Sequence, residues 1–258
     1  MRIINFGSGS HGNCTLVSYK DTNIIIDCGI NYKYVFNRIK ELGIDKIDGL
    51  LITHEHNDHI RYLAKFINHF RCNTYIHKAS FENINPSSYP GINQNYLCFI
   101  EPNYKFKIND LVFVPIELMH DTKANVGYLI KMDDLNMAYI TDTGILPDKY
   151  LNLLKQMNII VLESNHDVEM LLESARPYIL KQRILSDHGH LSNLQAAQIL
   201  REVINKETKI VMLAHLSEEC NTPELAYDEA IQVINDLNKD VKLFILSQHQ
   251  ETEAIIDD

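Results

Sequence analysis

The sequence predicts an α/β protein whose two halves each stack a mixed β-sheet under helices. Short apolar runs, such as residues 23–29 and 49–52, alternate with amphipathic segments, and this alternation is typical of strands joined by helices. Side chains able to bind a metal follow several of these runs directly. No Pro- or Ser-rich linker interrupts the 258 residues, so we expect one domain over residues 1–258.

The composition is that of a globular protein of the cytoplasm. The chain is 45% hydrophobic and 22% charged, and no apolar run approaches the roughly 18 residues that a membrane span needs. The N-terminus lacks a signal peptide, and the five scattered cysteines without a C-x-x-C pair indicate thiols of a reducing compartment. We expect a cytoplasmic protein without membrane contact, and no obligate protein partner is evident.

The first half of the chain contains most of the predicted strands. The amphipathic segment at residues 32–43 is expected to be a helix stopped by Gly43, and a second helical stripe runs from Ile60 to Ile67. Residues 85–95 have the composition of a loop. The strands are expected at residues 2–6, 14–19, 23–29, 49–52, 97–101, 104–108 and 111–116.

The second half begins with a predicted hairpin and then alternates between helix and strand. The hairpin pairs residues 127–132 with residues 136–141. Helices are expected at residues 147–157, 168–184, 192–206 and 223–238. Strands are expected at residues 159–162 and 209–213, and residues 241–246 are expected to close the fold.

The segment Thr53-His54-Glu55-His56-Asn57-Asp58-His59 directly follows a predicted strand. His54 and His56 are two residues apart, so they point the same way in an extended segment. Asp58 and His59 are adjacent and must diverge, which suits a second ion beside the first. Imidazole and carboxylate are ligands that zinc and manganese accept. The alternative is a polar loop in which Asp58 caps a helix that begins near Ile60; H-x-H-x-D-H rarely arises without a metal, so we favour the metal site.

Other polar residues stand at the ends of later predicted strands. His215 follows the predicted strand at 209–213, just as His54 follows the one at 49–52. We therefore choose His215 as a metal ligand over His166, His188 and His190. Asp142 follows the hairpin and could offer one oxygen to each of two cations, although a turn before Gly144 is an alternative. His120 follows the strand at 111–116 and is weak evidence by itself.

Three further histidines and one loop can each be interpreted in two ways. His188 and His190 lie in a glycine-containing loop before a helix, and His166 follows the strand at 159–162; each could be structural. The loop at residues 7–13 could be a simple hairpin connection. It could also be a wall of the active site, where backbone N–H groups and Ser10 or Asn13 meet an anion.

The H-x-H-x-D-H segment resembles the metal-binding motif of the metallo-β-lactamase-fold hydrolases. Further segments are similar to the YycJ/WalJ group of that superfamily, with tRNase Z as a more distant relative. They are the Gly-Ser-His-Gly-Asn loop, His120-Asp121 before Val126-Gly127-Tyr128, and the tracts beginning at Glu163, Asp187 and Ala214. Together they cover nearly the whole chain. Cys220 departs from the pattern, because an asparagine pair is expected there.

The resemblance implies a four-layer αβ/βα sandwich that holds two divalent ions. In the family, the first ion would be bound by His54, His56 and His120. The second would be bound by Asp58, His59 and His215, with Asp142 bridging. Asp27 would orient the H-x-H-x-D-H loop without touching the metal. Zinc and manganese are the expected ions, with iron as an alternative.

The resemblance also implies a mechanism. A hydroxide shared by the two ions would attack phosphorus in line. His190 lies in a segment similar to one of tRNase Z, whose histidine contacts the scissile phosphate; it would bind the phosphate or protonate the leaving oxygen, aided by His188. These two histidines and Asp58 are the candidate catalytic residues. Glu163 and His166 would form a supporting carboxylate–histidine pair, and Ser10 and Asn13 would lie near the substrate.

We therefore expect a metal-dependent phosphodiesterase or nuclease, plausibly a DNA exonuclease, with nucleic acid or another phosphodiester as its partner. The formal charge of −10 weakens the nucleic-acid hypothesis without excluding it, because two divalent ions add local positive charge. The alternative is a hydrolase of a small-molecule phosphodiester, a thioester or a lactam. A third hypothesis is a non-catalytic regulator on a hydrolase scaffold, which a complete ligand set disfavours.

Overall fold

The computed structural model describes residues 1–256 and contains two compact units. The N-terminal unit comprises Met1–Pro115, Thr122–Val126 and the C-terminal segment from Gln248. The C-terminal unit comprises Ile116–Asp121 and Gly127–Ser247. Among residues 1–256, none of the helices is both long and apolar enough to cross a membrane.

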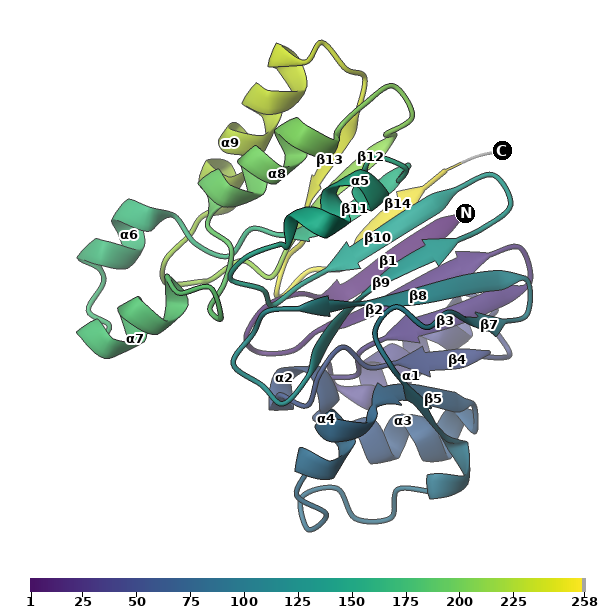
Figure 1. Cartoon of the computed structure of the whole chain (residues 1–258). Helices are drawn as coiled ribbons and strands as arrows, with labels where there is room; N and C mark the ends of the chain where they lie inside the picture. Colours follow the sequence, from purple (N-terminus) through teal and green to yellow (C-terminus); the bar gives the residue numbers. More distant parts are fainter. Residues whose placement is uncertain (257–258) are drawn as a thin grey trace. The chain divides into compact units, whose positions relative to one another are not determined.

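The N-terminal unit is built on a seven-stranded sheet of order β14-β1-β2-β3-β4-β5-β6 (Figure 1). The strands from β14 to β3 are antiparallel, and those from β3 to β6 are parallel. The strand bounds are β1 Arg2–Gly7, β2 Cys14–Tyr19, β3 Thr22–Ile26, β4 Gly49–Leu51, β5 Asn73–His77, β6 Leu97–Ile100 and β14 Thr252–Ile255. The helices are α1 Tyr32–Glu41, α2 Asn57–Ile60, α3 Leu63–Phe70, α4 Lys78–Asn83 and the 3-10 turn η1 Gln94–Tyr96.

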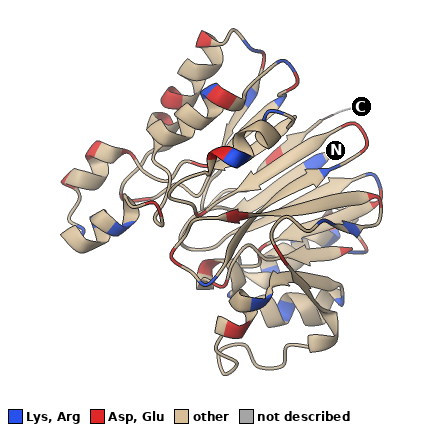
Figure 2. Ribbon diagram, in the orientation of Figure 1, with Lys and Arg blue, Asp and Glu red and all other residues tan. Residues whose placement is uncertain are grey.

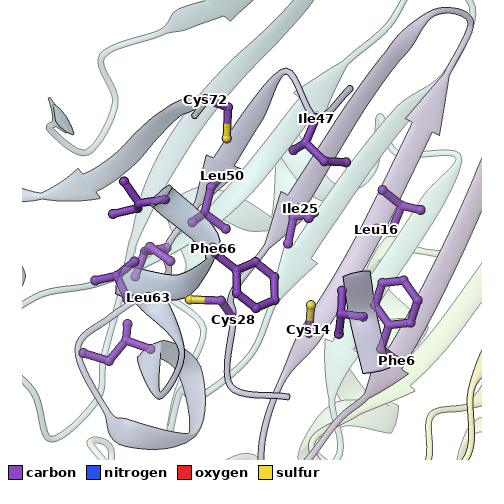
Figure 3. Packing of buried hydrophobic residues seen from close by; sticks show 14 of the residues in the cluster. Phe6, Cys14, Leu16, Ile25, Cys28, Ile47, Leu50, Leu63, Phe66 and Cys72 are labelled. Atoms are coloured by element: carbon purple, nitrogen blue, oxygen red, sulfur yellow. The ribbon is translucent and has the colours of Figure 1, made fainter. Parts of the chain in front are cut away.

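One face of this sheet carries the core of the N-terminal unit (Figure 3). Alternate residues of the strands point to this face, among them Leu16 of β2, Ile25 of β3 and Leu50 of β4. They pack with Leu63 and Phe66 of α3, and all five side chains are at most 1% exposed. Each such burial contributes about 1.5–3 kcal/mol, so the helices anchor the loops that leave β3 and β4.

The C-terminal unit holds most of a second sheet, of order β13-β12-β11-β10-β9-β8-β7. Strand β8 begins in the N-terminal unit, where it pairs with β7, and enters the C-terminal unit at Ile116. Strands β10 to β13 are parallel. The bounds are β7 Phe106–Ile108, β8 Leu111–Leu118, β9 Asn125–Lys131, β10 Asn136–Ile140, β11 Ile159–Glu163, β12 Ile210–Ala214 and β13 Lys242–Ile245.

The helices of the C-terminal unit follow its parallel strands. Helices α8 and α9 lie side by side, and α9 contacts β13 (Figure 1). The helix bounds are η2 Asp148–Tyr150, α5 Leu151–Leu154, α6 Val168–Glu173, α7 Tyr178–Ile184, α8 Asn193–Val203 and α9 Pro223–Asp236.

Several predicted elements need correction. Residues 241–246 do not close the fold, because β14 follows and pairs antiparallel with β1. Strand β5 and helix α4 were not predicted either, since both are short and carry little periodicity. The helices expected at residues 168–184 are α6 and α7, with Pro177 as the N-cap of α7. A single domain over residues 1–258 stays a prediction, and Asp257 and Asp258 lie outside the described residues.

Candidate metal centre

The H-x-H-x-D-H segment leaves the carboxyl end of β4, beside the carboxyl end of its parallel neighbour β3. Asp27, the first residue after β3, accepts hydrogen bonds on Oδ1 from the Thr53 N–H at 2.9 Å and from the Thr53 hydroxyl at 3.1 Å. Carboxyl ends of parallel strands meet at one edge of a sheet, so this edge collects polar side chains. Asp58 lies inside α2 and not at its N-cap, which is His56, so the helix-capping interpretation of Asp58 is wrong.

The three histidines of the segment gather at this edge. The ring of His54 lies 4.6 Å from that of His56 and 4.1 Å from that of His59, measured between centroids. His59 Nε2 is 3.3 Å from Asp58 Oδ2. His54 and His59 are fully buried, whereas His56 and Asp58 are partly exposed. The segment thus presents three imidazoles and one carboxylate together.

Buried acceptors orient two of these rings through Nδ1. His59 Nδ1 is 2.8 Å from Asp27 Oδ2, and His54 Nδ1 is 3.1 Å from the Thr53 hydroxyl. A carboxylate only accepts, so we assign the proton of His59 to Nδ1. Nε2 is then the basic nitrogen, which is the usual arrangement around a protein-bound metal. Burial raises the pKa of the Asp27 carboxyl, and His59 and Thr53 oppose this shift.

Asn13 joins the glycine-rich loop to the same segment. Its Nδ2 donates to Gly9 O and lies 3.3 Å from Asp58 Oδ2 and 3.1 Å from His59 Nε2. Its backbone N–H donates to Asp58 O at 2.8 Å. The loop is therefore both the β1–β2 connection and a wall of the cluster. Asn13 is buried there, and Ser10 is exposed.

The C-terminal unit brings a second group together at the ends of β10, β11 and β12. Asp142 Oδ1 lies 3.4 Å from His215 Nδ1 and 4.0 Å from His120 Nε2. The ring of His190 is 4.9 Å from that of His120 and 5.3 Å from that of His215, between centroids. The structure therefore brings together the predicted residues Asp142, His120, His190 and His215.

Glu163 orients two rings of this group. Its Oε1 is 2.7 Å from His190 Nδ1 and 3.1 Å from His215 Nδ1, and its Oε2 accepts from the Thr143 N–H at 2.9 Å. Burial alone would raise the pKa of the Glu163 carboxyl, but His190, followed by His215, lowers it to about 2. His120 Nδ1 lies 3.0 Å from Gly189 O. A carbonyl only accepts, so His120 also carries its proton on Nδ1 and presents Nε2.

An asparagine network holds the loops of the C-terminal unit in place. Asn165 Nδ2 donates to His215 O at 2.8 Å. Asn221 Nδ2 donates to the backbone oxygens of Ser164 and Asn165, and Asn193 Nδ2 donates to Asn221 Oδ1 at 2.8 Å. The polar role that the replacement by Cys220 put in doubt is therefore filled by Asn221.

The two groups fit divalent cations by their donor chemistry. One atom each of Asp142, Glu163, His190 and His215 lies within 4.8 Å of the others. Of these residues, Asp142 and His215 are the ligands proposed below, and Glu163 and His190 lie beside them. Several proposed ligands have Nδ1 held by a carboxylate, a hydroxyl or a carbonyl, which is typical of metal-binding histidines. Imidazole nitrogens clustered beside carboxylates form a site where a bound cation is stabilised.

The side chains of two predicted residues make no hydrogen bond to these groups within residues 1–256. His188 is exposed and, among residues 1–256, makes no hydrogen bond or ion pair. His166 is fully buried, its backbone bridges to Ser192, and neither ring nitrogen has a hydrogen-bond partner within the described residues. The roles of both residues stay predictions.

Sequence reasoning missed the residues that hold the ligands. Thr53 opens the predicted segment, yet its hydroxyl contact with Asp27 and His54 was not expected. Asn165 and Asn221 had no role assigned to them from the sequence. Glu55 was also unassigned, and its Oε1 accepts from the Lys123 N–H at 3.0 Å. Apart from the contact between Thr53 and His54, these contacts join segments far apart in the sequence, and only the polar character of the residues indicated them.

Comparison with known proteins identifies the superfamily. The β-lactamase superfamily domain matches residues 22–216. The chain is 34% identical to exodeoxyribonuclease YycJ of Bacillus anthracis over 239 residues, which is 89% of this chain and 87% of that protein. It is 30% identical to exodeoxyribonuclease WalJ of Streptococcus pneumoniae strain D39 over 85% of this chain and 83% of that protein. The chain belongs to the β-lactamase superfamily.

Solved structures agree on the fold. The metallo-β-lactamase-fold protein YhfI of Bacillus subtilis superposes with a TM-score of 0.71 at 16% identity, covering 97% of this chain and 98% of that one. The short form of human tRNase Z gives a TM-score of 0.62 at 14% identity, covering 98% of each chain. The predicted fold, the resemblance to the YycJ/WalJ group and the class of metal-dependent hydrolase are confirmed.

Proposed function

We propose that this protein is a metal-dependent phosphodiesterase that cleaves nucleic acid, with DNA exonuclease as the specific activity. One observation carries the proposal: the buried Glu163 carboxylate binds His190 at 2.7 Å beside Asp142 and His215. The names of the YycJ and WalJ relatives, both exodeoxyribonucleases, support DNA as the substrate. Acidic composition does not oppose this, since bound ions would supply local positive charge.

The proposed metal ligands are those of the two groups described above. His54, His56 and His120 would hold one ion, and Asp58, His59 and His215 the other, with Asp142 shared between them. Zinc or manganese suits these donors, and iron is an alternative. When bound, the ions supply an activated water and neutralise charge on the phosphoryl oxygens. Asp27 and Glu163 keep the imidazoles oriented.

His190 would act on the leaving group. Glu163 stays ionised, because its pKa is lowered to about 2, and its carboxylate accepts from His190 Nδ1 at 2.7 Å. With Nδ1 bound to Glu163, the Nε2–H of His190 can donate to the phosphate or to the leaving oxygen. An alkoxide leaving group needs this proton far more than a thiolate does, which favours a phosphodiester over a thioester. His188 and His166 would assist, and Ser10 and Asn13 would line the substrate.

Hydrolysis assays on the metal-reconstituted protein test the reaction class. We expect release of nitrophenol from bis(p-nitrophenyl) phosphate, and nucleotide release from end-labelled DNA in preference to RNA. A thioester and a chromogenic lactam serve as comparison substrates. Cleavage of either comparison substrate without cleavage of phosphodiesters would refute the proposal.

The variant His190→Ala tests the acid. We expect kcat to fall about 10²–10⁴-fold, with the metal content by atomic emission unchanged, because His190 is not among the proposed ligands. His54→Gln should lose metal and activity together. His69→Gln is the matched control, since His69 stacks on Phe36 at 3.9 Å and is not in either group. An unchanged kcat in His190→Ala removes His190 from the mechanism.

A further inference from the structure

Arg61 is held on the surface beside Asp58. It follows α2 directly, and its backbone N–H donates to Asn57 O at 2.9 Å. Its Nη1 donates to His11 O at 2.9 Å. The loop that carries His11 also contacts Asp58, through the Asn13 N–H at 2.8 Å. The guanidinium is therefore held against the loop that contacts Asp58, and it faces solvent.

Arg61 also carries a positive charge that no carboxylate of residues 1–256 neutralises in an ion pair. Five of the seven arginines form ion pairs; they are Arg2, Arg38, Arg176, Arg183 and Arg201. Among the described residues, no carboxylate oxygen lies within 4 Å of the Arg61 guanidinium. Its hydrogen bonds go to neutral oxygens, the His11 carbonyl and Asn57 Oδ1, which accepts from Nε at 3.2 Å and from Nη2 at 3.3 Å. In a chain with a formal charge of −10, such a cation is a local attractor for an anion.

Two exposed histidines share this part of the surface. The His11 N–H donates to Gln248 Oε1 at 2.8 Å, and Gln248 Nε2 donates to Gly12 O at 3.1 Å. These bonds bring His249 next to the glycine-rich loop, with its ring 6.1 Å from that of His11 between centroids. His11, Arg61 and His249, far apart in the sequence, thus lie on one polar rim.

We infer that Arg61, His11 and His249 form a contact site for a phosphate of the substrate strand adjacent to the scissile phosphate. A guanidinium offers a planar pair of N–H donors that matches phosphate oxygens, and the imidazoles add further donors. The site rests on the proposed function, because the strand passes Arg61 only if it is cleaved beside Asp58. It contacts the backbone and therefore reads no base sequence.

Steady-state kinetics on two substrates of different length test the site. One is single-stranded DNA, and the other is the p-nitrophenyl ester of thymidine 5′-monophosphate, which has no flanking phosphate. In Arg61→Gln we expect KM for DNA to rise about tenfold and the slope of log KM against log salt to fall by about one. The thymidine ester should show no such loss, and the metal content should match that of the wild type.

Two further variants make the result specific. Arg61→Lys keeps the charge and should retain the salt slope while losing part of the affinity. Arg71→Gln removes the other arginine that lacks an ion pair and should leave the DNA kinetics unchanged. Equal KM values for DNA in Arg61→Gln and wild type would overturn the inference while the proposed function stands. A wild type that cleaves neither substrate overturns the proposed function and this inference with it.

Discussion

Three of the residues that form the candidate metal centre adopt left-handed backbone conformations. The φ angles are 61° at Asp27, 58° at Asp142 and 58° at His215. A non-glycine residue in this region costs on the order of 1–3 kcal/mol, less for aspartate than for histidine. The strain turns each side chain out of its strand direction at the sheet edge. Such conformations persist where the surrounding hydrogen bonds define them, as those of Thr53, Glu163 and Asn165 do here.

His166 is a buried histidine of the C-terminal unit whose ring has no hydrogen-bond partner within the described residues. Its ring is fully buried, and burial lowers its pKa to about 4, while Glu163 opposes this shift. Asp167 also opposes the shift, whereas His190 and Arg176 add to it. A protonated ring is therefore disfavoured in the folded protein relative to the unfolded chain, where histidine titrates near 6.5.

This difference predicts an acid-labile contribution to stability. The contribution is complete above pH 6.5 and is lost as the pH falls from 6.5 toward 4, because the unfolded chain then binds a proton that the folded protein resists. It amounts to up to about 3 kcal/mol. Urea unfolding of the metal-free protein at pH 7.5 and pH 4.5 measures it. His166→Phe should lose less stability between these pH values than the wild type, and His69→Gln should behave as the wild type. Identical losses in all three proteins would contradict the account of His166.

At the scale of elements, each unit has a glycine two residues after an aspartate that follows a strand. Asp27-Cys28-Gly29 follows β3, and Asp142-Thr143-Gly144 follows β10. In both, a loop of the candidate site packs against the glycine. A Cβ on Gly29 would lie 1.6 Å from Asp58 O, and one on Gly144 would lie 2.2 Å from Ser186 O. The glycines allow the ligand-bearing loops to approach the strand ends.

We therefore predict that Gly29→Ala disrupts metal binding more than it disrupts the fold. The added methyl group meets backbone that cannot move aside cheaply, so α2 must shift at Asp58, with a cost of about 1–3 kcal/mol. Isothermal titration with Zn²⁺ should show at least a tenfold weaker affinity, together with a lowered Tm.

Gly43→Ala is the control for this substitution. Gly43 has a φ of 71° and no atom within 4 Å of the position of a Cβ, so alanine there adds only backbone strain of about 1–2 kcal/mol. Zinc affinity should be unchanged in this variant. Wild-type zinc affinity in Gly29→Ala would show that the close packing at Gly29 does not position the ligands.

At the scale of the whole molecule, charge is the feature that bears on the substrate. Helices α6 and α9 carry acidic residues, α7 carries basic residues, and α8 carries both (Figure 2). Many are paired with one another, as Arg201 is with Asp236 at 2.7 Å. The protein thus combines a formal charge of −10 with a proposed nucleic-acid substrate, and attraction must come from local cations.

This balance predicts that DNA binding depends on the bound metal. Two divalent ions add four positive charges at the place where phosphate binds, so removing them should weaken DNA binding at least about tenfold at fixed ionic strength. Fluorescence anisotropy with labelled DNA and the His190→Ala variant measures binding without cleavage. Equal affinity of the chelator-treated and metal-loaded proteins would contradict this expectation.

The chain's local patterns were sufficient for most of the fold and for the identity of the polar clusters. Buried strands such as β4 and β12 are apolar runs of regular length, and His54 and His215 follow them closely enough to be recognised. The weakly periodic strands β5 and β14 were not predicted. Strand β14 forms through its pairing with β1 and has no sequence pattern of its own.

The sequence alone therefore determined most of the element types, the H-x-H-x-D-H segment and the superfamily. Only the tertiary structure decided which acceptor orients each imidazole, and that a glycine supports the loop bearing Asp58. The reason is physical. Periodicity reports on neighbours within a few residues, whereas Glu163 meets His215 across 52 positions and Asp27 meets His59 across 32. Tertiary packing determines which of these residues meet. No local pattern of hydrophobic and polar residues encodes that packing.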